Sequence, residues 1–525
     1  MAKKAKRASK GKQDHVVEIE QKFDVPTDFV LPELIDLPGV AVVDDPVVHQ
    51  LEATYLDTEG LDLLTHKWIL RRRTGGSDAG WHLKRPLPDG ERDEMQFPVG
   101  RSSKTIPVAV QRAVAVHARG RALVPIARLS TTRTVRALRD RQGEVLAEVM
   151  LDAVDAASLH ADGQVRDAST WFEMEIELGT GDRALLRALD ERVRSAGAWP
   201  SPSVSKLAQA MQERLAVEPL GRIAPPSRYG PSTAVGVVLT YLAGEVGHLQ
   251  ANDPLVRIDA DDAVHQMRVA SRRLRSALAT FRPLFDRSIT DPIRTELQWI
   301  GTELGSARDV EVIRDHLIAA VAAEPAALQH GPVVRRIRST MAARYKQAHT
   351  HGVAQLGSER YYALLDSLDA LVADPPLAPD AGTLPVEHLT KLVRRTWRTI
   401  DALHDELDRT DDRYERDVHL HEVRKAAKRA RYAGEALSPT FGAAASGFAS
   451  AMAAIQGALG DHQDSVVIRE ELIALAAAAE EADESTFTYG RLHALEQVRG
   501  AETEEAFAAA WKKASDRSVL RWLGA

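Results

Sequence analysis

Hydrophobic and polar residues alternate along short segments between residues 16 and 178, a pattern typical of β-strands with one buried face. Turn residues separate these segments, so we expect an antiparallel sheet or barrel. The expected strands are 16–23, 51–57, 68–74, 81–86, 128–138, 145–152 and 171–178. Apolar residues with helical spacing predict flanking helices at 103–118, 182–196 and 205–215.

The pattern changes at residues 217–231, where four prolines and two glycines interrupt both periodicities and predict a linker. Beyond it, alanine, leucine and arginine recur with helical spacing to the end, apart from an interruption at 374–385. At 525 residues the chain is long enough for two cores. We therefore expect an α+β protein with a flexible basic tail at 1–14, a β-domain at 15–216, the linker and an all-helical domain at 232–523.

The helical half contains an internal repeat. Val264-His265, followed by Arg268, Arg272, Arg273 and Arg275, matches Leu420-His421, followed by Arg424, Lys428, Arg429 and Arg431, with an offset of 421 − 265 = 156. Leu304-Gly305 with Asp309 matches Leu459-Gly460 with Asp464, with an offset of 459 − 304 = 155. The nearly equal offsets indicate duplication of a helical segment.

Each copy of the repeat predicts a helix with one basic and one apolar face. His265, Arg268, Arg272 and Arg275 form a single stripe, as do His421, Arg424, Lys428 and Arg431. Such rows of like charge repel, so an anion should compensate them. One alternative is a solvated face paired with acids such as Glu435, Asp309 or Asp464. The other is an extended phosphate chain, because guanidinium groups fork onto phosphate oxygens.

The run V-H-x-x-R-V-x-x-R-R-L-R at 264–275, its second copy and L-G-x-x-R-D at 304–309 resemble the CHAD family of helical domains. The second L-G motif departs from the pattern, with Gln463 in place of the arginine. The resemblance implies two pseudo-symmetric helical bundles that bind inorganic polyphosphate. Besides the two stripes, the candidate ligands are Arg273, Arg335, Arg338, Lys391, Arg394, Arg398 and Lys425.

Charged residues alternate with apolar ones in the β-half. Strand geometry places Glu18, Glu20 and Lys22 on one face, and it does the same for Glu173, Glu175 and Glu177. Bases occupy alternating positions elsewhere: Arg71, Arg73, Lys84, Arg92, Arg133 and, later, Lys206. For any single strand this pattern could simply separate solvent from core. Together, carboxylates suit hard divalent cations and bases suit phosphate, so both halves of a metal–triphosphate complex are provided.

The same residues resemble the CYTH family, the triphosphate tunnel metalloenzymes. The motif E-x-E-x-K at 18–22 is followed in family order by 70–73, 82–84, Arg92-x-Glu94, 147–149 with Asp152, 173–177 and Ser205-Lys206. The resemblance implies an eight-stranded tunnel in which Glu18, Glu20, Glu173, Glu175 and Glu177 hold Mg²⁺ or Mn²⁺. It implies catalytic roles for Lys22, Glu148 and Asp152, and a triphosphate path lined by the six bases above.

Composition narrows the remaining choices. The net charge of −7 would repel a polyanion, so an anion site must come from local clusters of bases. Cysteine is absent, which excludes disulfides and thiolate chemistry and suits a reducing cytoplasm. No apolar run reaches membrane-spanning length, and the low aromatic content of 5% argues against nucleic acid as a ligand. These patterns do not specify the oligomeric state or an association with polyphosphate granules.

Three functions fit these patterns. We favour a metal-dependent hydrolase of inorganic triphosphate or a related triphosphate, joined to a polyphosphate-binding helical domain. The alternatives are a polyphosphate-binding protein whose tunnel is inactive, and an adenylate cyclase of the class IV type. The carboxylate rows favour hydrolysis, and no aromatic segment predicts a nucleobase site.

Overall fold

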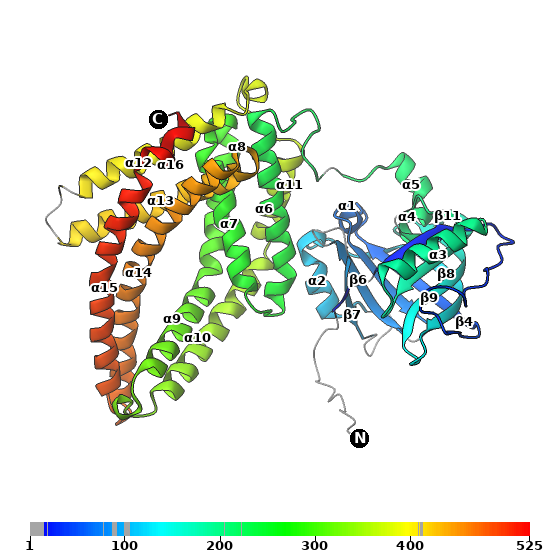
Figure 1. Ribbon diagram of the computed structural model, residues 1–525, viewed down its shortest axis with the longest axis horizontal. Helices are drawn as coiled ribbons and strands as arrows, with labels where there is room; N and C mark the ends of the chain where they lie inside the picture. The colour runs from blue at the N-terminus through cyan, green and yellow to red at the C-terminus, as the bar shows by residue number, and fades with distance from the viewer. Residues whose placement is uncertain are drawn as a thin grey trace. The chain divides into compact units, whose positions relative to one another are not determined.

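The computed structural model describes residues 15–17, 19–76, 78–86, 92–98, 105–203, 205–221, 223–407, 409 and 413–524. For residues 15–17, 92, 93, 413, 414, 417, 501 and 504 it describes the backbone alone. The expected basic tail at 1–14 and Glu18 lie outside this set. The chain divides at residues 222 and 223 into two compact units, a β-unit and a helical unit (Figure 1).

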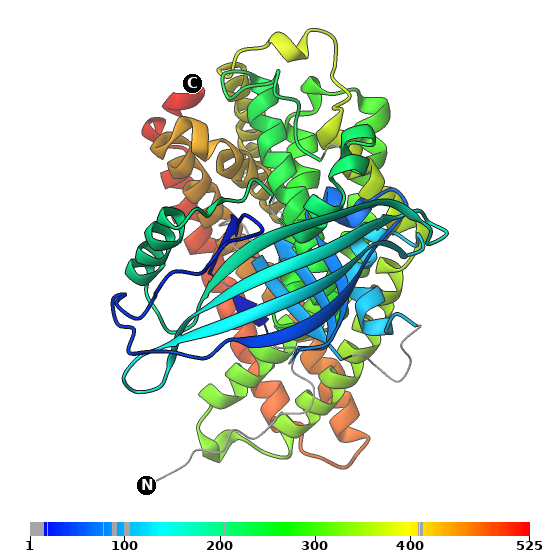
Figure 2. The same cartoon turned by 90° about the vertical axis from the view of Figure 1, so that its right-hand side faces the viewer.

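The β-unit is one antiparallel sheet. Its strands are β1 His15–Val17, β2 Glu20–Asp24, β3 Val42–Val43, β4 Val47–Asp57, β5 Ile69–Thr74, β6 Gly80–Pro86, β7 Arg92–Phe97, β8 Val124–Arg139, β9 Val145–Leu159, β10 Val165–Leu178 and β11 Trp199–Pro200. They run in the order β1-β7-β6-β5-β4-β8-β9-β10-β2-β11, and β3 pairs with β8. The long neighbouring strands β8, β9 and β10 dominate Figure 2.

The sheet closes on itself through its first strand. β1 pairs with β7 at one end of the strand order, whereas β2 pairs with β10 near the other end. Residues 18 and 19 alone separate β1 from β2, so the two act as one interrupted strand. Without the two-residue strands β3 and β11, the described residues form a tunnel of eight principal strands. This confirms the fold class expected from the alternating pattern.

Helices cover the apolar outer face of this sheet. They are α1 Asp62–Thr65, α2 Val108–Ala118, α3 Arg183–Ser195, α4 Lys206–Ala210 and α5 Gln212–Val217. Asp182 begins α3 by accepting hydrogen bonds from the backbone of Ala184 and Leu185. Leu189 and Val193 then pack against Phe23, Ile176 and other buried residues of the sheet. Because strand residues alternate, the opposite charged face must line the tunnel.

Local backbone features shift two of the expected helices. The expected helix at 205–215 is divided into α4 and α5 at Met211, whose ψ of 4° lies outside the helical range. Within the described residues, the helix expected at 103–118 begins only at Val108. Pro107 immediately precedes it with an extended ψ of 142°.

The helical unit consists of α6 Ala234–Arg257, α7 Ala263–Thr280, α8 Arg287–Glu303, α9 Gly305–Ala323, α10 Val333–Leu356, α11 Glu359–Ala373, α12 His388–Leu407, α13 Arg413–Phe441, α14 Ala443–Glu480, α15 Phe487–Ala514 and α16 Arg517–Leu520. Short 3₁₀ turns lie at Arg282–Leu284, Ala326–Leu328, Ala381–Thr383 and Arg521–Leu523. None of the described helices combines the length and apolar character needed to cross a membrane.

The repeat is visible in the order of these helices. The duplicated basic segments form α7 and α13, which pack against each other. The long hairpins α9–α10 and α14–α15 meet at their far ends, as Figure 1 shows, through a core that includes Leu317, Ile337, Ile468 and Leu472. The repeated glycine has a steric role: a Cβ on Gly305 would lie 3.4 Å from the guanidinium of Arg268, and the same holds for Gly460 and Arg424.

Candidate functional sites

The interior of the β-unit is a cavity of about 350 Å³ lined mainly by charged side chains. The predicted site residues that line it are Glu20, Lys22, Arg71, Arg73, Lys84, Arg133, Glu148, Glu175, Glu177 and Lys206. Six strands and α4 supply these side chains. Strand closure therefore gathers residues that are far apart in the sequence around one space.

One wall of the cavity carries a row of three carboxylates. Glu20 on β2 lies opposite Glu177 on β10, and Glu177 lies opposite Glu148 on β9. Like charges directly opposite each other on neighbouring strands are destabilising, so a cation would relieve the row. Carboxylate oxygens are the ligands that Mg²⁺ and Mn²⁺ prefer. The donor set thus fits a divalent metal.

A second group of acids, Asp152, Glu173 and Glu175, has ligand atoms within 4.8 Å of one another. Protein cations already compensate this group. The Lys206 Nζ lies 2.9, 2.5 and 2.7 Å from Asp152, Glu173 and Glu175, respectively. Arg133 adds contacts of 2.7 Å to Asp152 and 2.6 Å to Glu175. The Glu20–Glu177–Glu148 row, all of which lines the cavity, is a further candidate for the metal.

Burial changes the expected roles of two of these acids. Asp152 is 2% exposed and Glu173 is fully buried, and neither lines the cavity. Glu173 also binds the Lys22 Nζ at 2.9 Å and accepts a hydrogen bond from the indole of Trp171. Their position suits holding Lys206, Arg133 and Lys22 in place better than direct contact with a substrate or metal.

The charges of this network are mutually stabilised. Burial would lower the pKa of Lys206, but Glu175, Asp152 and Glu173 outweigh it and hold that pKa above its ordinary value. Burial would likewise raise the pKa of Glu175, but Lys206 and Arg133 keep it well below its ordinary value. Both groups consequently stay charged near neutral pH.

Bases line the opposite wall. Arg71 and Arg73 project from β5, and Lys84 projects from the adjacent β6. Glu94 on β7 binds the Lys84 Nζ at 2.8 Å and the Nδ1 of His82, and these contacts overcome burial to lower the pKa of Glu94. Arg73 pairs with Asp78, yet burial and the charge of Arg71 lower its pKa. The side chain of Arg92 lies outside the described residues.

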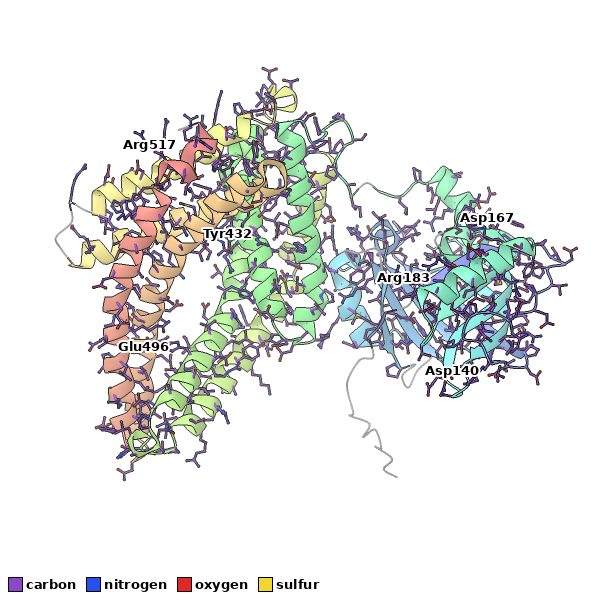
Figure 3. The ribbon with its side chains drawn as sticks, in the orientation of Figure 1. Asp140, Asp167, Arg183, Tyr432, Glu496 and Arg517 are labelled. Carbon is purple, nitrogen blue, oxygen red and sulfur yellow. The ribbon has the colours of Figure 1, made fainter. Side chains whose placement is uncertain are left out.

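The helical unit contains a separate basic cavity of about 430 Å³ between α7, α8 and α13. The polar residues that line it are Arg272, Arg275, Ser276, Arg294, Gln298, His421, Arg424, Lys425, Lys428, Arg429 and Tyr432. Figure 3 labels Tyr432 on α13. None of the described residues that line this cavity is acidic. Burial and the charges of Arg272 and Arg424 lower the pKa of Lys428 to about 8.

Other predicted polyphosphate ligands lie elsewhere. Glu435 lies 3.1 Å from Arg273 and 2.6 Å from Arg431, which is the acid pairing considered as the alternative reading. Arg268 binds the carbonyl of Gly305 and lies 3.0 Å from Asp309. His265 is half-buried beside Arg268 and Arg308. Burial is the main cause that lowers its pKa, and the charges of these two arginines lower it further.

The outlying candidates are also separate from the cavity. Arg394 donates to the carbonyl of Leu523, whereas Lys391 and Arg398 are exposed on α12. Arg335 and Arg338 are exposed on α10, where Arg335 lies 3.6 Å from Glu484. The sequence analysis did not predict Arg294, because the second copy of the repeat has no basic residue at the corresponding position. The spacing of Arg287, Arg294 and Gln298 along one helix face could have revealed it.

Comparison with known proteins agrees with this architecture. The CYTH domain model matches residues 17–210, and the CHAD domain model matches residues 240–473. Two proteins of Mycobacterium tuberculosis, from strains CDC 1551 and H37Rv and both described as uncharacterized, are 36% identical over 516 residues, which cover 96% of this chain and 97% of theirs. The chain belongs to the family that joins a CYTH domain to a CHAD domain.

Solved structures resemble single units of this CYTH–CHAD protein. PptA from Streptomyces chartreusis is 22% identical, covers 54% of this chain and 99% of its own, and has a TM-score of 0.46. The CHAD domain of the plant Ricinus communis is 28% identical with a TM-score of 0.42, covering 57% of this chain and 96% of its own. HpAC1 from Hippeastrum, described as having a dominant triphosphatase activity, is 18% identical with a TM-score of 0.24 and covers 37% and 96%.

Proposed function

We propose that the CYTH domain is a divalent-metal-dependent hydrolase of inorganic triphosphate or a related triphosphate. One observation carries the proposal: a single cavity of about 350 Å³ has carboxylates from β2, β9 and β10 on one wall and bases from β5 and β6 on the other. Such a cavity offers sites for a metal ion and for phosphoryl oxygens at the same time.

The residues divide the chemistry between them. Glu20, Glu148 and Glu177 would hold Mg²⁺ or Mn²⁺, which would withdraw charge from the phosphoryl group and lower the pKa of bound water. Arg71, Arg73 and Lys84 bind the phosphate oxygens and stabilise the charge that spreads over them during transfer. Because buried acids hold Arg133 and Lys206 in place, both bases meet the substrate with little reorganisation. Lys22 lines the same space, and Glu173 holds its ammonium group.

Hydrolysis is favoured over cyclisation of ATP by the lining of the cavity. Among the described residues that line it, His49 and Tyr55 are the sole aromatic rings, and Tyr55 is 4% exposed. A nucleobase normally requires an accessible ring or a shaped polar pocket beside the phosphate site. Triphosphate alone requires neither.

Product analysis tests the proposal. The full chain is incubated with triphosphate, ATP or thiamine triphosphate, with Mg²⁺, Mn²⁺ or EDTA, and both phosphate and cyclic nucleotide are measured. We expect metal-dependent phosphate release that Glu20→Gln lowers by at least about a hundredfold. Glu52→Gln, which changes an exposed carboxylate on β4, provides a matched control. Cyclic AMP as the main product would establish the cyclase alternative, and absence of turnover would leave a binding protein.

We further propose that the CHAD domain binds inorganic polyphosphate in the basic cavity between α7, α8 and α13. The cavity gathers cations from three helices without an acid among its described lining residues, and burial together with the charges of Arg272 and Arg424 lowers the pKa of Lys428. A chain of phosphates would compensate several of them at once. Fluorescence-detected binding of long-chain polyphosphate to the full chain in EDTA tests this, and a wild-type protein without measurable affinity would refute it.

A further inference from the structure

A second basic pocket of about 230 Å³ adjoins the basic cavity of the helical unit. It lies where the end of α7, the following turn, α8, α12 and α13 meet, and it is lined by Ala279, Thr280, Arg282, Pro283, Arg287, Leu392, Arg395, Thr396, Thr399, Ala426 and Arg429. Ala279 and Arg429 line both spaces, so the two lie next to each other. No sequence pattern pointed to this pocket.

The pocket has an excess of positive charge. Arg287, Arg395 and Arg429 form no ion pair with any acid among the described residues, whereas Arg282 pairs with Asp291. Burial and the neighbouring charge of Arg294 lower the pKa of Arg429. An anion that enters such a cluster would relieve the repulsion between these charges.

An unsatisfied hydroxyl provides a second, independent indication of a ligand. Thr280, at the end of α7, is 7% exposed and lines the pocket, yet its Oγ1 has no hydrogen-bond partner. Buried hydroxyl groups are normally hydrogen-bonded, because an unpaired one carries a desolvation penalty. A phosphate oxygen in the pocket would supply the missing acceptor.

The other copy of the internal repeat shows the position equivalent to this pocket in a form where acids neutralise the arginine. Arg429 is the counterpart of Arg273, because 429 − 273 = 156. Arg273 is neutralised by Glu245 at 3.3 Å and Glu435 at 3.1 Å. Glu435 corresponds to Ala279, because 435 − 279 = 156.

The other acid also has a neutral counterpart. Buried positions of α6 recur in α12 with a second offset, as in 392 − 238 = 154 and 400 − 246 = 154. Glu245 then corresponds to Thr399, because 399 − 245 = 154. Ala279 and Thr399 both line the second pocket. Arg429 therefore lacks both acids that neutralise its copy, and the duplicated fold is closed on one side and open on the other.

The two spaces form a single track along α7. Arg272, Arg275 and Ala279 follow one another at helical spacing on α7, where the seven steps from the first to the last rise roughly 10 Å, and Arg282 follows in the 3₁₀ turn after the helix. We propose that the pocket is a second subsite for the same polyphosphate chain, which leaves the basic cavity past Arg429 and is held by Arg287, Arg395 and the hydroxyl of Thr280. This inference rests on the proposed polyphosphate binding, and it makes affinity depend on chain length.

The test compares substitutions of equal charge in the full chain, in EDTA so that the tunnel does not consume the probe. Arg287→Ala with Arg395→Ala should weaken binding of long-chain polyphosphate about tenfold, as expected when charge-assisted contacts are lost. Binding of tripolyphosphate should match that of the wild type. Lys512→Ala with Arg517→Ala, both exposed and outside the pocket, should leave both probes unaffected.

A third variant tests the same subsite while it keeps every basic residue. Ala279→Glu reproduces the closed side of the repeat, so it should pair with Arg429 and also weaken long-chain binding. Thermal melting of each variant establishes that it is folded. If the introduced carboxylate pairs with Arg429, this substitution should leave the stability of the folded protein unchanged or raise it. The test therefore remains possible even if the double alanine variant does not fold.

Other outcomes separate the two proposals. Equal losses in the control variant with Lys512→Ala and Arg517→Ala and in the pocket variant would overturn the subsite in favour of general attraction. A pocket variant that loses tripolyphosphate as strongly as long chains would show an independent anion site and overturn the continuous track. If Arg272→Ala with Lys428→Ala weakens binding while every pocket variant behaves like the wild type, the subsite falls and polyphosphate binding stands. A wild-type protein that binds no polyphosphate would refute the binding proposal itself.

Discussion

Removing the ammonium group of Lys206 should destabilise the CYTH domain strongly. In Lys206→Met the side chain keeps its length, but Asp152, Glu173 and Glu175 lose the cation that lies within 2.9 Å of each. Lys206 is 11% exposed, and two of the three acids are buried, so solvent cannot replace the lost charge. Breaking a buried ion pair from one side typically costs about 3–5 kcal/mol. Because Arg133 still contacts two of the acids and compensates part of their charge, we expect a loss of stability near the lower end of this range.

The loss of stability in Lys206→Met should depend on pH, and the pKa of Glu175 gives the direction of that dependence. In the wild type the pKa of Glu175 lies well below its ordinary value, so its contribution to stability is present above the unfolded pKa and is lost as the pH falls through the folded pKa. Without Lys206 that pKa rises. The difference between variant and wild type should therefore be greatest at neutral pH and should shrink as acid protonates the carboxylates.

Hydrogen exchange read by mass spectrometry on peptides of β8, β9 and β10 measures this loss in the CYTH domain alone. That matters because a chain with two compact units need not unfold in one step. Glu175→Gln in the Lys206→Met background should restore part of the stability, because it removes one uncompensated charge. Arg183→Met, on the exposed surface of α3 where Figure 3 labels it, is the control. A loss below about 1 kcal/mol at neutral pH, or one that grows in acid, would refute the reasoning.

Three further predictions concern the two sites. Glu20→Gln should abolish metal-dependent turnover and leave polyphosphate affinity unchanged, as separate turnover and binding assays would show; a parallel loss of affinity would contradict independent sites. Because the pKa of Lys428 is lowered to about 8, polyphosphate affinity should fall as the pH rises through that value, and Lys428→Arg should remove this part of the pH profile. Arg272→Ala with Lys428→Ala should flatten the dependence of log affinity on log salt by up to about one unit per lost contact. Lys512→Ala with Arg517→Ala, both exposed and outside the cavity, should not alter the slope, and equal slopes in the two double variants would mean that the basic stripes are only solvated helix faces.

The sequence alone determined which face of each element its residues occupy. Strand alternation placed Glu20 and Lys22 on one face, and helical spacing placed Arg272 and Arg275 on one stripe, because side-chain direction follows from local backbone geometry. The same periodicities predicted a linker between two folded parts, and the chain divides into two compact units at residues 222 and 223. The duplication was visible because its two copies kept nearly the same spacing between motifs.

The tertiary structure decided which charges cancel. Arg133 meets Asp152 because β8 and β9 pair in one particular register, and Lys206 reaches three acids because α4 follows the closed sheet. Similarly, Glu435 neutralises Arg273 in one half of the helical unit, whereas Ala279 leaves Arg429 open in the other. These partners are far apart in the sequence. Local periodicity specifies the face on which a charge lies, but strand register and helix packing specify the charge that it meets.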